Sequence, residues 1–140
     1  MQQNFDGAKI ALLQAGRVLV YQRDDKPGIP WPGCWDLPGG GREGQETPLA
    51  CVQREVQEEF GLAISASQVL WQRSYANPRG GILPTWFMAG ALTPAQIAAI
   101  RFGDEGQRWQ MMPAVVFIQH PQGIAHLRQR LAHYLQLAAI

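Results

Sequence analysis

Acidic side chains are concentrated in one stretch of this 140-residue sequence, GGGREGQETPLACVQREVQEEFGL, which covers residues 39–62. The stretch holds five of the 11 Asp and Glu residues of the chain, and Glu55, Glu58 and Glu59 fall within five positions. Carboxylate oxygens are ligands that Mg²⁺ prefers, together with waters and substrate phosphates. The three glutamates therefore suit a divalent cation, although an acidic helix face turned to water is the ordinary alternative.

The flanking residues predict a helix that begins after Thr47 and ends at Phe60. Thr47 is a favoured N-cap, Pro48 suits the first helical position, and Gly61 is the residue type that most often ends a helix in a left-handed conformation. On a helical wheel one apolar stripe is expected to face the core, and it consists of Leu49, Val52, Val56 and Phe60. The glutamates fill one flank of this helix, with Glu59 nearest the buried stripe.

The charges of this helix do not stabilise it by themselves. Glu55 and Glu59 are like charges four residues apart, which costs roughly 0.2 to 0.5 kcal/mol, and they lie in the half of the helix where the dipole disfavours anions. Arg54 and Glu58 are opposite charges four residues apart, and their attraction offsets this cost by a similar amount of free energy. Upstream, Gly39, Gly40 and Gly41 (residues 39–41) let the backbone approach the helix and leave a carbonyl free as an oxygen ligand, although such a run is equally a flexible turn.

The rest of the chain predicts an α/β protein. Expected strands cover residues 9–13, 17–22, 34–37, 68–75, 82–91 and 108–112. Residues 93–100 predict a short helix, and the segment from Pro121 onward predicts an amphipathic helix that covers the sheet. Pro and Gly dominate residues 24–41, which predicts a long loop.

Composition excludes several classes of protein. Twelve Lys and Arg against 11 Asp and Glu give a net charge of +1, so we expect no stable nucleic-acid partner. Cys34 and Cys51 stand alone, without the spacing of a zinc site or of a disulfide framework. No stretch of 18 apolar residues and no secretory leader is visible, so we expect one domain over residues 1–140, cytoplasmic, with no membrane partner.

The acidic stretch resembles the signature of the Nudix hydrolase family, G x5 E x7 R E U x E E x G U, where U is a bulky aliphatic residue. The match extends from residue 40 to residue 62 without a departure, and such a match arises by chance at about one start position in a billion. The matching residues are Gly40, Glu46, Arg54, Glu55, Val56, Glu58, Glu59, Gly61 and Leu62. This resemblance implies an α/β/α sandwich around a mixed β-sheet, and hydrolysis of a nucleoside diphosphate linked to another moiety with Mg²⁺ or Mn²⁺ as cofactor.

The resemblance also implies roles for single residues. Glu55, Glu58 and Glu59 match the metal ligands of the family, and the carbonyl of Gly39 or Gly40 matches its backbone ligand. Arg54 resembles the residue that orients the glutamates, and Glu46 resembles a supporting carboxylate.

Family members often add an acidic ligand or general base from a loop before a late strand. In this sequence Glu105 is the better match and Asp104 is the second. The alternative, that both are ordinary turn residues without a role in the site, remains open. Which of Glu55, Glu58 and Glu105 takes the proton of the attacking water is open as well.

The substrate is less well specified. Arg23 resembles a phosphate-binding arginine of some members, with a surface role as the alternative. Several aromatic side chains offer a flat surface for stacking on a base: Tyr21, Trp31, Trp35, Trp86 and Trp109. Trp35 is our first candidate, although packing in the core is the commoner use of tryptophan. We expect a nucleoside triphosphate, oxidised forms included, to be cleaved to a nucleoside monophosphate and pyrophosphate. Nucleotide sugars and dinucleoside polyphosphates remain alternative substrates, and a non-catalytic nucleotide-binding module remains an alternative function. Whether the protein forms a homodimer is left open by the sequence.

Overall fold

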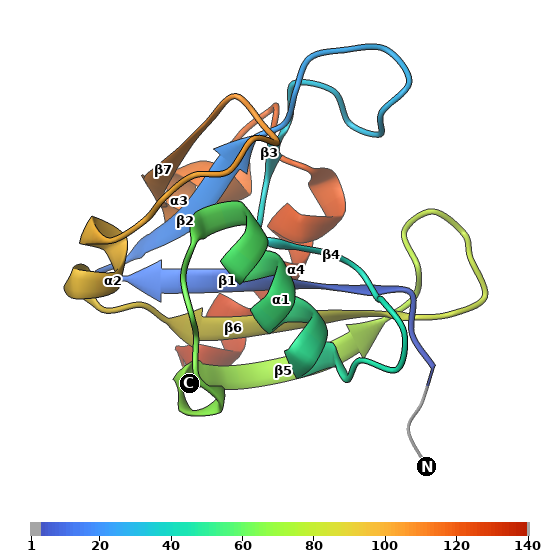
Figure 1. Cartoon of the computed structure of the whole chain (residues 1–140), viewed down its shortest axis with the longest axis horizontal. Coiled ribbons are helices and arrows are strands. Elements are labelled where there is room, and N and C mark those ends of the chain that lie inside the picture. The colour runs from blue at the N-terminus through green and yellow to red at the C-terminus, as the bar shows by residue number, and fades with distance from the viewer. Residues whose placement is uncertain (1–3, 140) are drawn as a thin grey trace.

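The computed structural model describes residues 4–139, and Figure 1 shows its helices and strands. The strands are β1 (Gly7–Gln14), β2 (Arg17–Gln22), β3 (Trp35–Asp36), β4 (Gly39–Gly41), β5 (Val69–Tyr75), β6 (Thr85–Ala91) and β7 (Arg108–Pro113). The helices are α1 (Pro48–Phe60), α2 (Pro94–Ala98), α3 (Ala114–Gln119) and α4 (Ala125–Ala138), with a 3₁₀ turn at Ala66–Gln68.

The strands form one mixed sheet in which β1 is central. The order is β3-β2-β1-β6-β5, while β4 pairs with β1 and β7 pairs with β2. Strands β1 and β6 are parallel, and the other pairs are antiparallel. Because β4 lies against the start of β1, the glycine run is attached to the middle of the sheet rather than to its edge.

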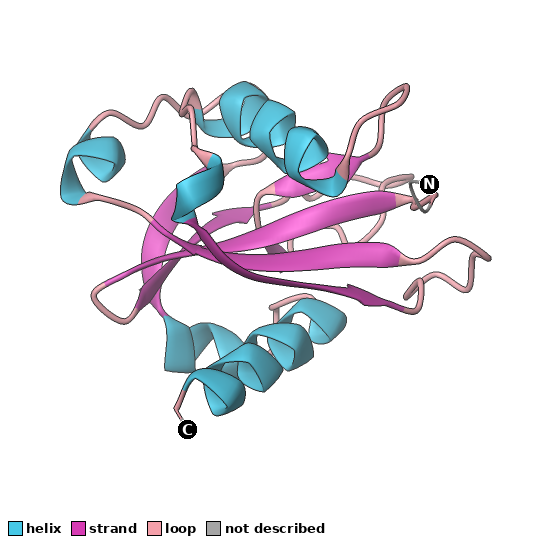
Figure 2. Cartoon of the chain, turned by 90° about the horizontal axis from the view of Figure 1, so that it is seen from below, coloured by secondary structure: helices cyan, strands magenta, loops and turns pink. Residues whose placement is uncertain are grey.

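Helices cover both faces of the sheet, with α1 on one side and α3 and α4 on the other (Figure 2). Side chains of β1 alternate between the two layers, since Ile10 and Leu12 pack on the α1 side and Ala11 on the α4 side. This arrangement confirms the predicted α/β/α sandwich around a mixed sheet. None of the described helices is long and apolar enough to cross a membrane.

Helix α1 begins and ends as its sequence predicts. The Oγ1 of Thr47 accepts a hydrogen bond from the Ala50 N–H at 3.1 Å, Pro48 occupies the first turn, and Gly61 ends the helix with φ of 66°. Val52, Val56 and Phe60 are fully buried, as the predicted stripe requires, while Leu49 is only partly buried. Cys51, which was not part of that stripe, is buried as well.

Three short elements differ from the prediction. Residues 39–41, predicted as a turn, form the strand β4, because a partner strand supplies the hydrogen bonds that glycine propensity alone would not predict. The strand expected from Ile82 begins at Thr85, and Ile82 lies fully exposed in the preceding turn. Helix α3 was not predicted, since its six residues, AVVFIQ, are rich in β-branched side chains.

Candidate functional site

Glu59 points from α1 toward the glycine strand β4. Its Oε1 accepts a hydrogen bond from the Gly39 N–H at 2.9 Å. Burial raises the pKa of Glu59 to about 8, although the Lys9 ammonium and the Gly39 hydrogen bond both act to lower it. A largely buried carboxylate with so high a pKa lacks a sufficient positive partner among the described residues, which is the condition that a bound cation would relieve.

Arg54 gathers the other carboxylates of the acidic stretch. Its guanidinium lies 2.7 Å from Glu46, 2.6 Å from Glu55, 2.9 Å from Glu43 and 3.3 Å from Glu58. The hydrogen bond from Arg54 holds the pKa of Glu46 below its usual value, and the hydrogen bond to Glu46 in turn raises the pKa of Arg54. Glu43, to which the sequence assigned no role, is therefore part of this ion-pair cluster.

The glycine strand comes close enough to its neighbours that side chains are excluded. At Gly39, where φ is 133°, an added Cβ would clash with the Ala8 carbonyl oxygen. At Gly40 an added Cβ would lie 2.6 Å from a carboxylate oxygen of Glu55. The backbone carbonyl of Gly39 already accepts a hydrogen bond from Lys9 Nζ at 3.1 Å, so this strand contacts both the acidic helix and a cation from β1.

A cavity of about 260 Å³ brings the acidic helix together with the loop that precedes β7. Its lining consists of Glu55, Glu58, Glu59, Gly103, Asp104 and Glu105. Gly103 is tied to α1 because its N–H donates to the Glu59 carbonyl oxygen at 2.9 Å. The structure thus brings both loop candidates, Asp104 and Glu105, to the glutamates of α1.

These donors are all oxygen atoms, which is the donor chemistry that Mg²⁺ or Mn²⁺ requires. As the side chains lie, no three acidic, Cys or His side chains within residues 4–139 converge closely enough to hold an ion. Arg54 holds Glu55 and Glu58 instead, with the shorter contact to Glu55. The donor set fits a hard divalent cation, provided that these two carboxylates turn from the guanidinium toward the cavity.

A second charge network, centred on Asp36 of β3, reaches the glycine strand through Lys9 of β1. The carboxylate of Asp36 is 1% exposed and accepts hydrogen bonds from Lys9, Arg23, Tyr21 and the Leu37 N–H. Sequence reasoning missed both Lys9 and Asp36. A lysine in the otherwise apolar strand AKIALL and an aspartate directly before LPGGG were the signals that could have identified them.

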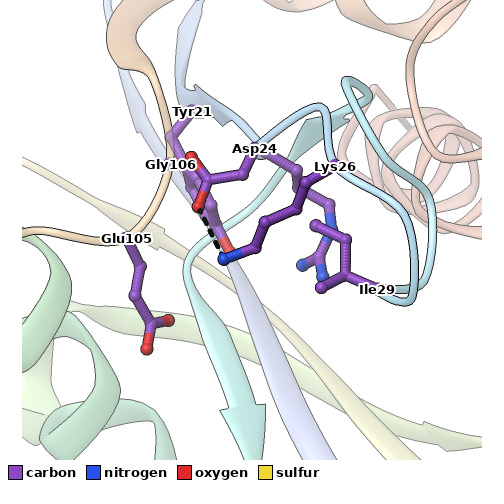
Figure 3. Close-up of a pocket in the computed structure, with 7 residues that line it drawn as sticks. Tyr21, Asp24, Lys26, Ile29, Glu105 and Gly106 are labelled. Carbon is purple, nitrogen blue, oxygen red and sulfur yellow. Dashed lines mark ion pairs between the residues drawn. The ribbon is translucent and has the colours of Figure 1, made fainter.

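Arg23 lies at a second cavity, of about 240 Å³, which Figure 3 shows. It is lined by Tyr21, Arg23, Asp24, Lys26, Ile29, Glu105 and Gly106. Lys26 and Asp24 form an exposed pair at 4.0 Å on one side, and Glu105 lies on the other side, nearest to α1. Because Glu105 also lines the acidic cavity, the predicted phosphate-binding arginine and the acidic residues belong to adjoining spaces.

A third cavity, of about 290 Å³, lies between β1, β6 and α4 and also includes Arg23. One wall pairs Trp31 with His126, whose ring centroids are 5.3 Å apart. Trp35, the expected stacking residue, lies in the core with 4% of its surface exposed and lines none of these cavities. The structure therefore places Trp31, rather than Trp35, where an aromatic ring can meet a ligand.

Comparison with known protein families gives one match over most of the chain: a model described as NUDIX domain matches residues 4–133. Among curated relatives, a MutT-like protein of Streptomyces ambofaciens is 35% identical over 80 residues, which are 57% of this chain and 47% of that protein. An RNA pyrophosphohydrolase of Acidiphilium cryptum is 33% identical over 96 residues, 68% of this chain and 49% of that one. The chain thus spans about half the length of these relatives.

Solved structures share the fold at low sequence identity. A MutT protein from Methanosarcina mazei Go1 superposes with a TM-score of 0.76 at 17% identity, covering 99% of this chain and 98% of that one. A bifunctional NMN adenylyltransferase/ADP ribose pyrophosphatase from Francisella tularensis, complexed with AMP and a Mn ion, gives a TM-score of 0.72 at 18% identity. That match covers 97% of this chain and 42% of the other.

Proposed function

This chain belongs to the Nudix family of pyrophosphohydrolases, and from that premise we propose that it hydrolyses a nucleoside triphosphate to a nucleoside monophosphate and pyrophosphate with the help of Mg²⁺ or Mn²⁺. We further propose that residues 1–140 act as one catalytic domain. The observation that carries the proposal is the largely buried Glu59, because its pKa of about 8 marks a carboxylate that needs a positive partner at the edge of an acidic cavity.

The proposed metal ligands are Glu55, Glu58, Glu59 and Glu105, with the backbone carbonyl of Gly39 as a further ligand. Gly40 is the alternative carbonyl, and it accepts a hydrogen bond from Cys51 Sγ. Gly39 is favoured because its N–H donates to Glu59, and its carbonyl would exchange the Lys9 ammonium for the cation. When bound, a divalent cation neutralises the diphosphate and lowers the pKa of water. The Mn ion bound to the Francisella tularensis neighbour supports this cofactor class.

The protein's own groups then position the reactants. Arg23 lies at two cavities and is fixed by Asp36 at 3.0 Å and by the Pro30 carbonyl, so its guanidinium is held where phosphate oxygens can approach. Arg54 orients Glu55 and Glu58 through its ion pairs with both carboxylates. An acidic side chain of the cavity accepts the proton of the attacking water, and Glu105 is our choice because it is exposed and lies between two cavities.

Three substrate classes compete with a simple nucleoside triphosphate: nucleotide sugars, dinucleoside polyphosphates and RNA 5′ ends. The last gains support from the Acidiphilium cryptum relative, an RNA pyrophosphohydrolase, while the Streptomyces ambofaciens relative is a MutT-like protein. Oxidised nucleoside triphosphates belong to the proposed class as well. A panel that covers all four classes, with separate detection of phosphate and pyrophosphate, tests the proposal. Pyrophosphate release from a nucleoside triphosphate is expected, and cleavage of no member of the panel would refute a catalytic role.

The remaining alternative is a module that binds nucleotides without hydrolysing them. The complete set of glutamates around the acidic cavity argues against it, because a module that only binds the nucleotide does not need several carboxylates beside a phosphate chain. Binding without turnover in the presence of Mg²⁺ or Mn²⁺ would favour the module.

A further inference from the structure

Arg130 is a buried cation without a carboxylate partner among residues 4–139. Only 6% of its surface is exposed. Its guanidinium donates to Thr85 Oγ1 at 3.0 Å and to the Ala76 carbonyl at 3.1 Å, and it lies 4.5 Å from the ring centroid of Tyr75. Buried charges are costly unless they are paired with an opposite charge, and a neutral hydroxyl, a carbonyl and a ring supply none. An anion from outside the described residues would supply the opposite charge that Arg130 lacks.

Positive charge dominates one of the two cavities that Arg130 lines, the cavity of about 290 Å³ beside β1 and β6. The cationic side chains of this cavity are Lys9, Arg23, Arg79 and Arg130, and its one carboxylate is Asp6. Lys9 and Arg23 are both within 3.0 Å of Asp36, which lies behind the lining. With Asp6 and Asp36 counted, four positive charges face two negative ones, so the cavity suits a ligand with a negative charge of its own.

The same cavity adjoins the proposed catalytic strand. Gly40 and Gly41 contribute to its lining, and Lys9 links it to the Gly39 carbonyl at 3.1 Å. Its opposite wall carries the Trp31 and His126 rings, which offer an aromatic surface for a base. If the 5′ phosphates lie at the glutamates, the nucleoside enters this cavity, and the inference rests to that extent on the proposed function.

We propose that this cavity binds a second phosphate of the substrate, an ester on the ribose of the nucleotide whose 5′ chain is cleaved, with Arg130 as its ion-pair partner. The guanidinium has five N–H donors, and its two hydrogen bonds within the protein leave others for phosphate oxygens. Arg79, exposed on the loop before β6, adds a second positive charge at the rim. A 3′-phosphate of a free nucleotide and the 3′ linkage of an oligonucleotide both present this chemistry.

The test compares kcat/KM for three substrates with the same base: the nucleoside 5′-triphosphate, its 3′-phosphorylated form, and the dinucleotide 5′-triphosphate. A charge-assisted hydrogen bond to a buried guanidinium is expected to favour one or both 3′-phosphorylated substrates by about tenfold or more. Preference for the 3′-monoester identifies free nucleotides as the source, and equal or greater preference for the dinucleotide identifies oligonucleotides. A ratio near one for both would overturn the proposal.

Variants test whether Arg130 causes the preference for 3′-phosphorylated substrates. R130Q should bring the ratio close to one, whereas R128Q should keep the wild-type ratio, because Arg128 lies on the same helix and donates to the Ile118 carbonyl outside this cavity. Thermal melting checks that the variants fold. If R130Q does not fold, R79Q serves in its place, and an unchanged ratio in R79Q then counts against a phosphate in this cavity.

Binding measured without turnover separates this inference from the proposed function. Tryptophan fluorescence in the presence of a chelator compares a nucleoside 3′,5′-bisphosphate with the 5′-monophosphate. Tighter binding of the bisphosphate, by about tenfold, is expected even if no triphosphate is hydrolysed, in which case only the proposed function fails. Equal binding of the two, with normal hydrolysis of triphosphates, would refute the second phosphate site alone.

Discussion

Replacing Glu59 by glutamine removes the charge of this side chain and keeps its hydrogen bond. Glutamine is nearly isosteric, and its Oε1 can still accept from the Gly39 N–H, which donates at 2.9 Å in the wild type. Loss of a proposed metal ligand should lower kcat by about a hundredfold or more. In the absence of divalent cations, however, the same substitution should make the fold more stable at high pH.

The magnitude follows from the pKa of Glu59, which burial raises from 4.5 to about 8. Between these two values the folded protein holds a proton that the unfolded chain releases, so the free energy of unfolding falls as pH rises from about 4.5 to 8. Above pH 8 the full penalty is present, and the shift corresponds to roughly 4 to 5 kcal/mol as an upper limit. At pH 5 the carboxyl of Glu59 is neutral in the folded protein, and the free energies of unfolding of the wild type and E59Q should differ by less than about 1 kcal/mol.

Urea denaturation at pH 5 and pH 9, with a chelator present, measures this difference directly. The groups that titrate in both proteins cancel, so the change with pH belongs to Glu59. E58Q is the matched control, because the Glu58 side chain is 58% exposed and its removal should give no gain that grows with pH. Saturating Mg²⁺ should stabilise the wild type and not E59Q. Equal stability of wild type and E59Q at pH 9 would refute the unneutralised buried charge on which the proposed function rests.

Three further predictions use other parts of the site. A chelator should abolish hydrolysis and Mg²⁺ or Mn²⁺ should restore it, while hydrolysis that is insensitive to the chelator would contradict the proposed metal ligands. G39A should destabilise the fold by about 3 kcal/mol or more, because the added Cβ clashes with the Ala8 backbone. G44A, with open space around the added Cβ, should cost about 1 kcal/mol, and urea titrations compare the two variants. Burial lowers the pKa of His126 to about 4, so the free energy of unfolding of the wild type should fall as pH falls from 6.5 to 4. H126N should show a smaller dependence on pH in this range, which thermal melts at several pH values measure.

The sequence predicted those parts of the fold whose signals are local. Caps at both ends and a 3.6-residue apolar stripe predicted α1, and alternating or apolar runs predicted β1, β2 and β7. The strand β4 and the helix α3 were not predictable in the same way. Glycines in β4 have no strand preference and pair only because β1 lies beside them, while the β-branched residues of α3 favour a strand until the sheet and α4 bury Ala114 and Phe117.

For the candidate site, the sequence predicted the donors better than their partners. The order of burial within α1, with Glu59 innermost, followed from the helical wheel, and the local spacing identified the pair of Arg54 with Glu58. The contact of Arg54 with Glu43 depends on how the loop before α1 folds back. Lys9 and Asp36 are 27 residues apart and meet only in the assembled sheet, so no periodicity could reveal them.

The charges around α1 explain why a cation is expected at this site rather than a further arginine. Arg54 supplies one positive charge to four carboxylates, those of Glu43, Glu46, Glu55 and Glu58. It orients these groups but does not relieve Glu59, whose opposing cation, Lys9, acts from β1 and leaves the pKa of Glu59 near 8. A divalent cation in the acidic cavity would contact Glu59 directly and attract phosphate oxygens at the same time, which a guanidinium tied to four carboxylates is unable to do. The buried charge of Glu59 therefore lowers the stability of the metal-free protein and raises the affinity for the cation. A variant that is more stable without metal because it lacks this charge should bind the cation more weakly.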